Sequence, residues 1–139
     1  MKRWLRSVLS LVVLFGAAAL ISCGGGGSDE FDFSGTWLFH ETVSQNSGME
    51  SFPPPGSRGE EFIILTQNDT TLVLTPEGSG TGFVGTCNPD DGTFRVAYAS
   101  GPLRFVITGA RTGDDTMSGE MNFEDGRASV KVVYTADRL

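Results

Sequence analysis

The 139-residue sequence has few of the residues that most often carry catalysis or bind metals. It contains one histidine, His40, and two cysteines, Cys23 and Cys87. No multi-histidine metal site can be built, and a serine–histidine–aspartate set would depend on His40, which strand alternation points outward. The acidic pairs at 90–91 and 114–115 lack EF-hand spacing, and turn formation explains them better than calcium binding. We expect no catalytic residue, metal or cofactor, and a protein that is not an enzyme.

Basic residues are also scarce. Ten Lys and Arg residues stand against 17 Asp and Glu, which gives a formal net charge of −7 and a pI of about 4.5. A phosphate backbone needs a basic face, so we expect no nucleic-acid partner. The hydrophobic content of 39% and the aromatic content of 10% are enough for one folded domain with a core.

The N-terminus has the layout of a secretory signal peptide. Lys2, Arg3 and Arg6 precede a mostly apolar run at 8–21. A membrane-spanning helix is the weaker alternative, because a run of this length rises about 21 Å, whereas the hydrocarbon core of a bilayer is about 30 Å thick. We therefore expect residues 1–22 to be a signal peptide that is removed.

The end of this segment, Leu20-Ile21-Ser22-Cys23, resembles the lipobox of bacterial lipoproteins. The resemblance implies cleavage before Cys23, a diacylglycerol on its thiol, further acylation of the new amine, and stable anchoring to a membrane. Ile21 is larger than the residue usual there, and a soluble secreted protein with a chance cysteine is the alternative. Gly24 replaces the Asp of the family's inner-membrane retention signal, which favours the outer membrane of a Gram-negative host and leaves open the periplasmic or surface face. Cys87 is then the one remaining thiol, so no intrachain disulfide is expected.

Residues 23–32 join the expected anchor to the rest of the chain. Four consecutive glycines follow Cys23 and have no side chain to bury, and three acidic residues come after them. This composition is typical of a flexible tether. We expect an acylated Cys23 with a glycine-rich tether over 23–32, followed by one folded domain over 33–139.

After Cys23 no segment has helical periodicity, and short runs rich in Val, Ile, Thr, Phe and Tyr alternate with turn residues. This pattern predicts eight strands, near 36–44, 60–67, 70–75, 80–87, 93–99, 103–110, 115–123 and 127–136. With an even number of antiparallel strands the last can pair with the first, which predicts an all-β, up-and-down barrel without exposed edges. A β-sandwich is the alternative. A membrane-spanning barrel is disfavoured, because Arg104, Glu120 and Lys131 would face lipid.

The first predicted strand opens with Phe33-Ser34-Gly35-Thr36-Trp37, which resembles the Gly-x-Trp opening of lipocalin-like (calycin) barrels. The resemblance covers about 33–139 and implies that the Trp lies inside the closed end, with a basic residue from the last strand packed across it. Arg138 shares the parity of Tyr134, and a closed barrel places it beside Trp37 for a cation–π contact. The alternative is that Trp37 is an ordinary core aromatic and Arg138 a frayed terminal charge.

The predicted barrel interior and the one long loop are the candidate binding regions. Inward-facing side chains that could line a pocket for a hydrophobic or amphiphilic ligand are Phe39, Phe94, Tyr98, Phe105, Met121 and Tyr134. We favour a largely filled interior, because an eight-stranded barrel is just wide enough for side chains or one small ligand. The loop at 45–59 is expected to be a lid or partner contact, with Met49 and Phe52 as its apolar contacts, or else a passive connection.

Two functions follow from these expectations. The first is a membrane-anchored lipoprotein whose barrel binds a small hydrophobic or amphiphilic ligand. The second is a protein–protein interaction module, an inhibitor or assembly accessory, with a filled barrel. A cavity above roughly 300 Å³ beneath the 45–59 loop would favour the first, and an exposed apolar rim would favour the second.

Overall fold

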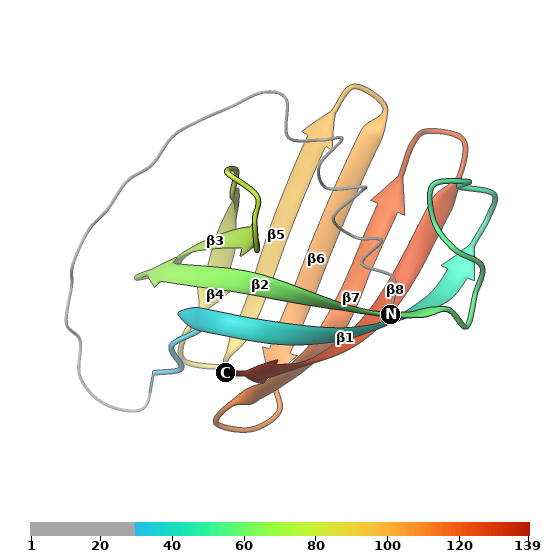
Figure 1. The fold of residues 1–139 in the computed structure, drawn as a ribbon. Helices are drawn as coiled ribbons and strands as arrows, with labels where there is room; N and C mark the ends of the chain where they lie inside the picture. The colour runs from blue at the N-terminus through green and yellow to red at the C-terminus, as the bar shows by residue number, and fades with distance from the viewer. Residues whose placement is uncertain (1–29) are drawn as a thin grey trace.

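The computed structural model describes residues 30–139. The expected signal peptide at 1–22, the expected lipidation site Cys23 and most of the expected tether lie outside the described residues. The strands, shown in Figure 1, are β1 (Gly35–Asn46), β2 (Arg58–Asn68), β3 (Thr71–Pro76), β4 (Phe83–Asn88), β5 (Thr93–Ser100), β6 (Leu103–Arg111), β7 (Thr116–Glu124) and β8 (Ser129–Arg138). Within the described residues, no helix is long and apolar enough to cross a bilayer.

The strands form one closed antiparallel barrel, in which β1 pairs with both β2 and β8. Trp37 shows this closure, because it lies opposite Ile63 of β2 and Arg138 of β8. The eight-stranded up-and-down barrel predicted from the sequence is confirmed, and the β-sandwich is excluded. A register shift between Val43 and Gln45 interrupts the pairing with β8, an irregularity that bends a long strand around a barrel.

Several strand boundaries differ from the predicted ones, most of all the start of β4. β4 begins at Phe83, later than predicted, because residues 77–82 form a turn held by its own backbone and serine hydrogen bonds. β1 continues to Asn46 because β8 still pairs with it there. The loop between β1 and β2 therefore covers 47–57 rather than 45–59.

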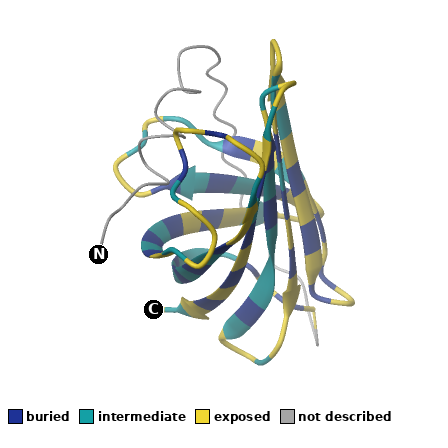
Figure 2. Cartoon of the chain, turned by 90° about the vertical axis from the view of Figure 1, so that its right-hand side faces the viewer, coloured by how far each residue is buried: buried dark blue, intermediate teal, exposed yellow. Residues whose placement is uncertain are grey.

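The two ends of the barrel differ. At the end we call the closed end, short turns follow β2, β4 and β6, and the chain enters β1 and leaves β8. At the opposite end, the open end, the 47–57 loop joins β1 to β2 and the 77–82 turn joins β3 to β4. Buried and exposed residues alternate along the strands between these ends (Figure 2), so each strand faces the core on one side and water on the other.

Trp37 is buried at the closed end and is tied to two other segments. Its indole Nε1 donates a hydrogen bond to the Phe33 carbonyl oxygen at 2.8 Å. The Arg138 guanidinium lies 4.8 Å from the ring centroid, and it also donates to the Ser34 carbonyl oxygen at 3.2 Å. The contact between Trp37 and Arg138 that the resemblance implied is therefore present, and it closes this end of the barrel.

The closed end also includes Phe31, which precedes the domain start expected at 33. Its amide donates to the Pro89 carbonyl oxygen at 2.8 Å, and its ring is buried. The guanidinium carbons of Arg111 and Arg138 lie 5.0 Å and 5.4 Å from the ring centroid. Phe31 lies in the stretch expected to be a tether, and its ring packs against the closed end of the barrel.

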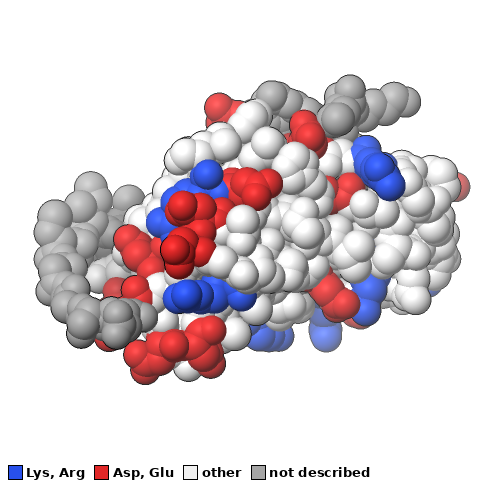
Figure 3. Space-filling model, turned by 90° about the horizontal axis from the view of Figure 1, so that it is seen from below, with Lys and Arg blue, Asp and Glu red and all other residues white. Residues whose placement is uncertain are grey.

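Charged side chains lie mainly on the outer surface of the barrel. Lys131 pairs with Glu120 at 3.3 Å, and Arg138 pairs with Asp115 at 3.3 Å. Acidic and basic side chains are intermixed in the view from below (Figure 3). The outward position of Lys131 and Glu120 agrees with the alternation predicted for β7 and β8.

The Tyr134 side chain lies inside the barrel, against two glycines of the wall. The backbone register sets it beside Gly119 of β7, which in turn lies beside Gly109 of β6. The Tyr134 hydroxyl donates to the Thr108 carbonyl oxygen at 2.9 Å. A Cβ on Gly119 would overlap the Thr108 carbonyl oxygen and lie 2.6 Å from the Tyr134 hydroxyl. The phenol therefore occupies the space that side chains at these two positions would need.

Replacing Gly119 should destabilise the barrel, because a backbone oxygen cannot move aside as a flexible side chain can. We expect Gly119→Ala to lower the free energy of unfolding by about 1–3 kcal/mol, measured by urea denaturation. Gly80→Ala is the matched control, since nothing lies within 4 Å of a Cβ there. Equal denaturation midpoints for the two variants would show that Tyr134 and Thr108 are not tightly packed against Gly119.

Candidate ligand-binding site in the barrel interior

The six side chains predicted to line a pocket divide into three places. Phe39 and Tyr134 pack together near mid-barrel, with ring centroids 4.6 Å apart. Tyr98 and Phe105 meet near the open end through Phe83, which lies 5.3 Å from each ring. The remaining two are Phe94, which packs against Phe33 at the closed end, and Met121, which is fully buried.

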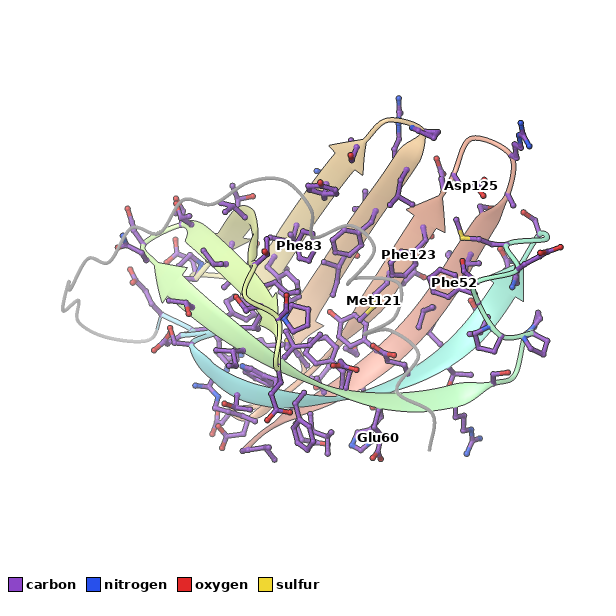
Figure 4. The ribbon with its side chains drawn as sticks, turned by 45° about the horizontal axis from the view of Figure 1, so that its top comes forward. Phe52, Glu60, Phe83, Met121, Phe123 and Asp125 are labelled. Carbon is purple, nitrogen blue, oxygen red and sulfur yellow. The ribbon has the colours of Figure 1, made fainter. Side chains whose placement is uncertain are left out.

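A continuous series of aromatic rings leads from the 47–57 loop into the barrel. Neighbouring ring centroids lie 4.7–5.4 Å apart along the series Phe52, Phe123, Phe105, Phe83 and Tyr98. Figure 4 shows the labelled Phe52, Phe83 and Phe123 pointing into the barrel from three different segments. The open end is thus filled by rings in mutual contact, with Phe52 contributed by a loop and the others by strands.

The 47–57 loop is organised by one side chain at its start. The side-chain Nδ2 of Asn46 donates to the carbonyl oxygens of Met49, Phe52 and Pro53 at 3.2–3.3 Å. The Asn46 side-chain oxygen accepts from the amides of Gly48 and Met49. These contacts fold the loop on itself, and Met49 and Phe52 are buried. A groove of about 410 Å³ lies on this loop and is lined by its own residues, rather than beneath it.

Two carboxyl groups are buried in the barrel, and the sequence analysis missed both as site residues. Glu41 is 2% exposed and Glu61 is 1% exposed. Strand alternation predicts that both point inward. Glu41 shares the parity of Trp37 and Phe39, and Glu61 shares that of Ile63. Both side chains are hydrophilic, so hydropathy alone does not place them in the core.

The position of Glu41 follows from the register of β1 with its two neighbours. Glu41 lies opposite Tyr134 of β8 and opposite Gly59 of β2. Glu61 lies opposite Phe39, one inward position away from Glu41 along the strands. Inward residues on this diagonal of adjacent strands lie within about 8 Å of each other. The barrel thus holds two carboxyl groups on neighbouring strands beside an aromatic pair.

Burial changes the acidity of this cluster. It raises the pKa of Glu41 from 4.5 to about 8, and the negative charge of Glu61 adds to the effect. Burial also raises the pKa of Tyr134, with a further contribution from the charge of Glu41. The Glu41 Oε1 atom is buried without a hydrogen-bond partner. Every Lys and Arg between residues 30 and 139 is exposed or half-buried, and the two that pack on buried rings, Arg111 and Arg138, lie at the closed end.

His40 points outward, as predicted, into a different setting. Its Nδ1 lies 3.0 Å from Glu60 and its Nε2 lies 3.3 Å from Asp137. The two partners belong to β2 and β8, on either side of β1, and Figure 4 shows Glu60 pointing away from the barrel. This group borders a groove of about 430 Å³ whose lining includes Arg58 and also Gly59, Glu41 and Tyr134. Among the described residues, no group of three or more His, Cys, Asp or Glu side chains could hold a metal ion.

Comparisons with known proteins bear on the fold. No family model and no curated protein matches the sequence. The structure is similar to the monomer form of the M. tuberculosis PknI sensor domain, with a TM-score of 0.53 and 11% sequence identity over 77% of this chain and 87% of that chain. Likeness at this identity concerns the fold alone, and the lipocalin and lipoprotein assignments stay predictions.

The raised pKa of Glu41 predicts an unusual pH dependence of stability. Between about pH 4.5 and pH 8 the folded protein keeps a proton on Glu41 that the unfolded chain releases. The free energy of unfolding should therefore fall by roughly 3–5 kcal/mol as the pH rises through this window, and then level off.

Urea denaturation at pH 5 to 9 measures this dependence. Glu41→Gln should remove most of the slope and be the more stable form at pH 9. Glu60→Gln on the outer face is the control and should keep the wild-type slope. A wild-type slope in Glu41→Gln would contradict the assignment of the proton to this carboxyl.

Proposed function

We propose that this chain is a lipid-anchored, non-enzymatic binding domain that takes a small amphiphilic molecule through the open end of its barrel. The observation that carries the proposal is the difference between the two ends. Short turns, Trp37, Arg138 and Phe31 fill the closed end, whereas part of the open end is filled by a loop residue, Phe52. A molecule can enter at the open end without breaking the strand pairing.

The cost of opening supports this route. Lifting the 47–57 loop would exchange hydrogen bonds from Asn46 and from the backbone of Ser47 and Gly56 for bonds to water, and it would expose mainly Met49 and Phe52. Exposing a buried apolar side chain costs about 1.5–3 kcal/mol. An apolar ligand that contacts Phe123 and Phe105 in place of Phe52 would recover this cost by burying its own surface.

The polar groups deeper in the barrel favour an amphiphilic ligand over a purely apolar one. Glu41 has a buried carboxylate oxygen with no hydrogen-bond partner, which a polar head group can bind. The likeness to a protein described as a sensor domain is consistent with binding rather than catalysis. The scarcity of catalytic residue types points the same way.

The place where the chain enters the barrel supports anchoring through Cys23. Glu30 and Phe31 lie at the closed end, beside Arg111 and Arg138. Cys23 precedes Glu30 by seven positions, which span at most about 25 Å. An acyl group on Cys23 would therefore hold the closed end near the membrane and leave the open end free to face the envelope space.

A protein–protein module is the second candidate, and one observation favours it. Val84 of β4 is 58% exposed and Ile64 of β2 is 40% exposed, on the outer face of the barrel. On β3, which lies between these two strands, Val73 pairs with Val84. A partner that covers this apolar area would need no opening of the barrel.

Binding and entry are tested together with the fluorescent probe N-phenyl-1-naphthylamine, which is uncharged near neutral pH. We expect its fluorescence to rise on binding, and Phe52→Ala to increase the association rate constant by about tenfold, as expected for a barrier lowered by one side-chain contact. The measurement is stopped-flow fluorescence. Val84→Ala is the control and should leave the rate unchanged. Absence of binding, or equal rates for Phe52→Ala and the wild type, would contradict entry past the loop.

Anchoring is tested by labelling bacteria that express the chain with radioactive palmitate. We expect the wild type to incorporate the label and Cys23→Ser to lose it, because the thiol is the acceptor of the diacylglycerol. Cys87→Ser is the matched control and should keep the label. Equal labelling of the wild type and Cys23→Ser, or an unmodified Cys23 by mass spectrometry, would contradict a lipoprotein.

A further inference from the structure

The buried carboxyl groups point to a particular class of ligand head group. Glu41 and Glu61 are the two acidic side chains buried within residues 30–139, and every Lys and Arg of this part lies at least partly in water. A buried carboxylate is unfavourable unless it is paired with a positive charge or takes up a proton. Retaining Glu41 at an inward position of β1 costs stability that an apolar residue would not cost.

We infer that Glu41, supported by the negative charge of Glu61, binds the protonated amine of an amphiphilic ligand, while the aromatic rings near the open end hold its apolar part. This inference rests on the proposed binding function and specifies the ligand as an aliphatic amine, which is charged near neutral pH. An ammonium group carries three donors and no acceptor, so it matches a site of carboxylate oxygens.

Neither cross-strand neighbour of Glu41 occupies its free oxygen. On the β2 side the residue opposite Glu41 is Gly59, which has no side chain. On the β8 side it is Tyr134, whose hydroxyl is already engaged by the Thr108 carbonyl oxygen. Oε1 of Glu41 is buried and has no hydrogen-bond partner. An incoming donor can therefore bind Oε1 without displacing the Tyr134 hydrogen bond.

The neighbouring aromatic rings favour a cation as well. Phe39 lies next to Glu41 on the inward face of β1, and its ring packs 4.6 Å from that of Tyr134. Aromatic faces attract ammonium groups, and this attraction is stronger away from water. The same rings would give an anionic head group an unfavourable environment beside two carboxyl groups.

Binding of an amine should release a proton. The titratable groups that face Glu41 from the strands beside it are Glu61 of β2 and Tyr134 of β8, and those on the inward faces of β4 and β5 are Cys87 and Tyr98. None of these is a base that carries a positive charge. Glu41 holds its proton below about pH 8, so an ammonium must displace that proton in order to pair with the carboxylate.

The test compares octylamine with 1-octanol by isothermal titration calorimetry on the purified full chain. Both probes have the same chain, and octylamine stays charged up to pH 9. The affinity for octylamine should increase about tenfold per unit between pH 6 and pH 8 and then level off, whereas the affinity for octanol should not change. At pH 7, titrations in phosphate and in Tris should differ in heat by the uptake of about one released proton.

Variants separate the two proposals. Glu41→Gln should reduce octylamine affinity at pH 8 to that of octanol and abolish proton release, while Glu60→Gln on the outer face should behave as wild type. Octylamine and octanol binding equally at every pH would overturn the amine assignment and leave the binding function intact. Binding of neither probe would overturn both. Binding of octylamine that Glu60→Gln abolishes and Glu41→Gln preserves would place the amine beside Glu60 on the outer face and overturn the site at Glu41.

Discussion

The pairing of β1 with β8 is the contact on which the rest of the molecule depends. It gives β1 a hydrogen-bonded neighbour on each side, so its inward side chains are surrounded by protein and cannot reach water between strands. It also brings Arg138 across Trp37 and so completes the closed end. The same closure that buries Trp37 and Phe39 also buries Glu41, because the three residues share one face of β1.

The interior of the barrel combines aromatic side chains in mutual contact with buried carboxyl groups. Rings in mutual contact fill both ends, and Tyr134 uses the space left by Gly109 and Gly119. Glu41 departs from this pattern, since a buried carboxyl with an unpartnered oxygen lowers stability at neutral pH. Departures of this kind concentrate at functional positions, where stability is given up for binding. The packing and the acid together are consistent with a barrel that opens at one end to admit an amphiphile.

Much of the fold could be predicted from the sequence, because period-two alternation and turn residues are local signals. Alternation in β5 to β8 and an even strand number predicted the closed barrel, and closure placed Arg138 beside Trp37. The burial of Phe31 and the start of β4 follow from tertiary packing and turn hydrogen bonds, which composition does not show. Strand alternation places Glu41 in the core although its side chain is hydrophilic. Its raised pKa comes first from burial and then from the charge of Glu61, which only the strand register brings near.

The protonation of Glu41 in the folded protein is the most direct test of a dry, closed interior. Carbon-13 labelling of glutamate carboxyl groups allows each to be titrated by NMR, with Glu41→Gln used to assign the resonance. A barrel closed by β1 and β8 predicts a midpoint near pH 8 for Glu41, well above the ordinary value of 4.5. A midpoint near 4.5 would show that water reaches this carboxyl, and it would contradict both the closed interior and the site built around it.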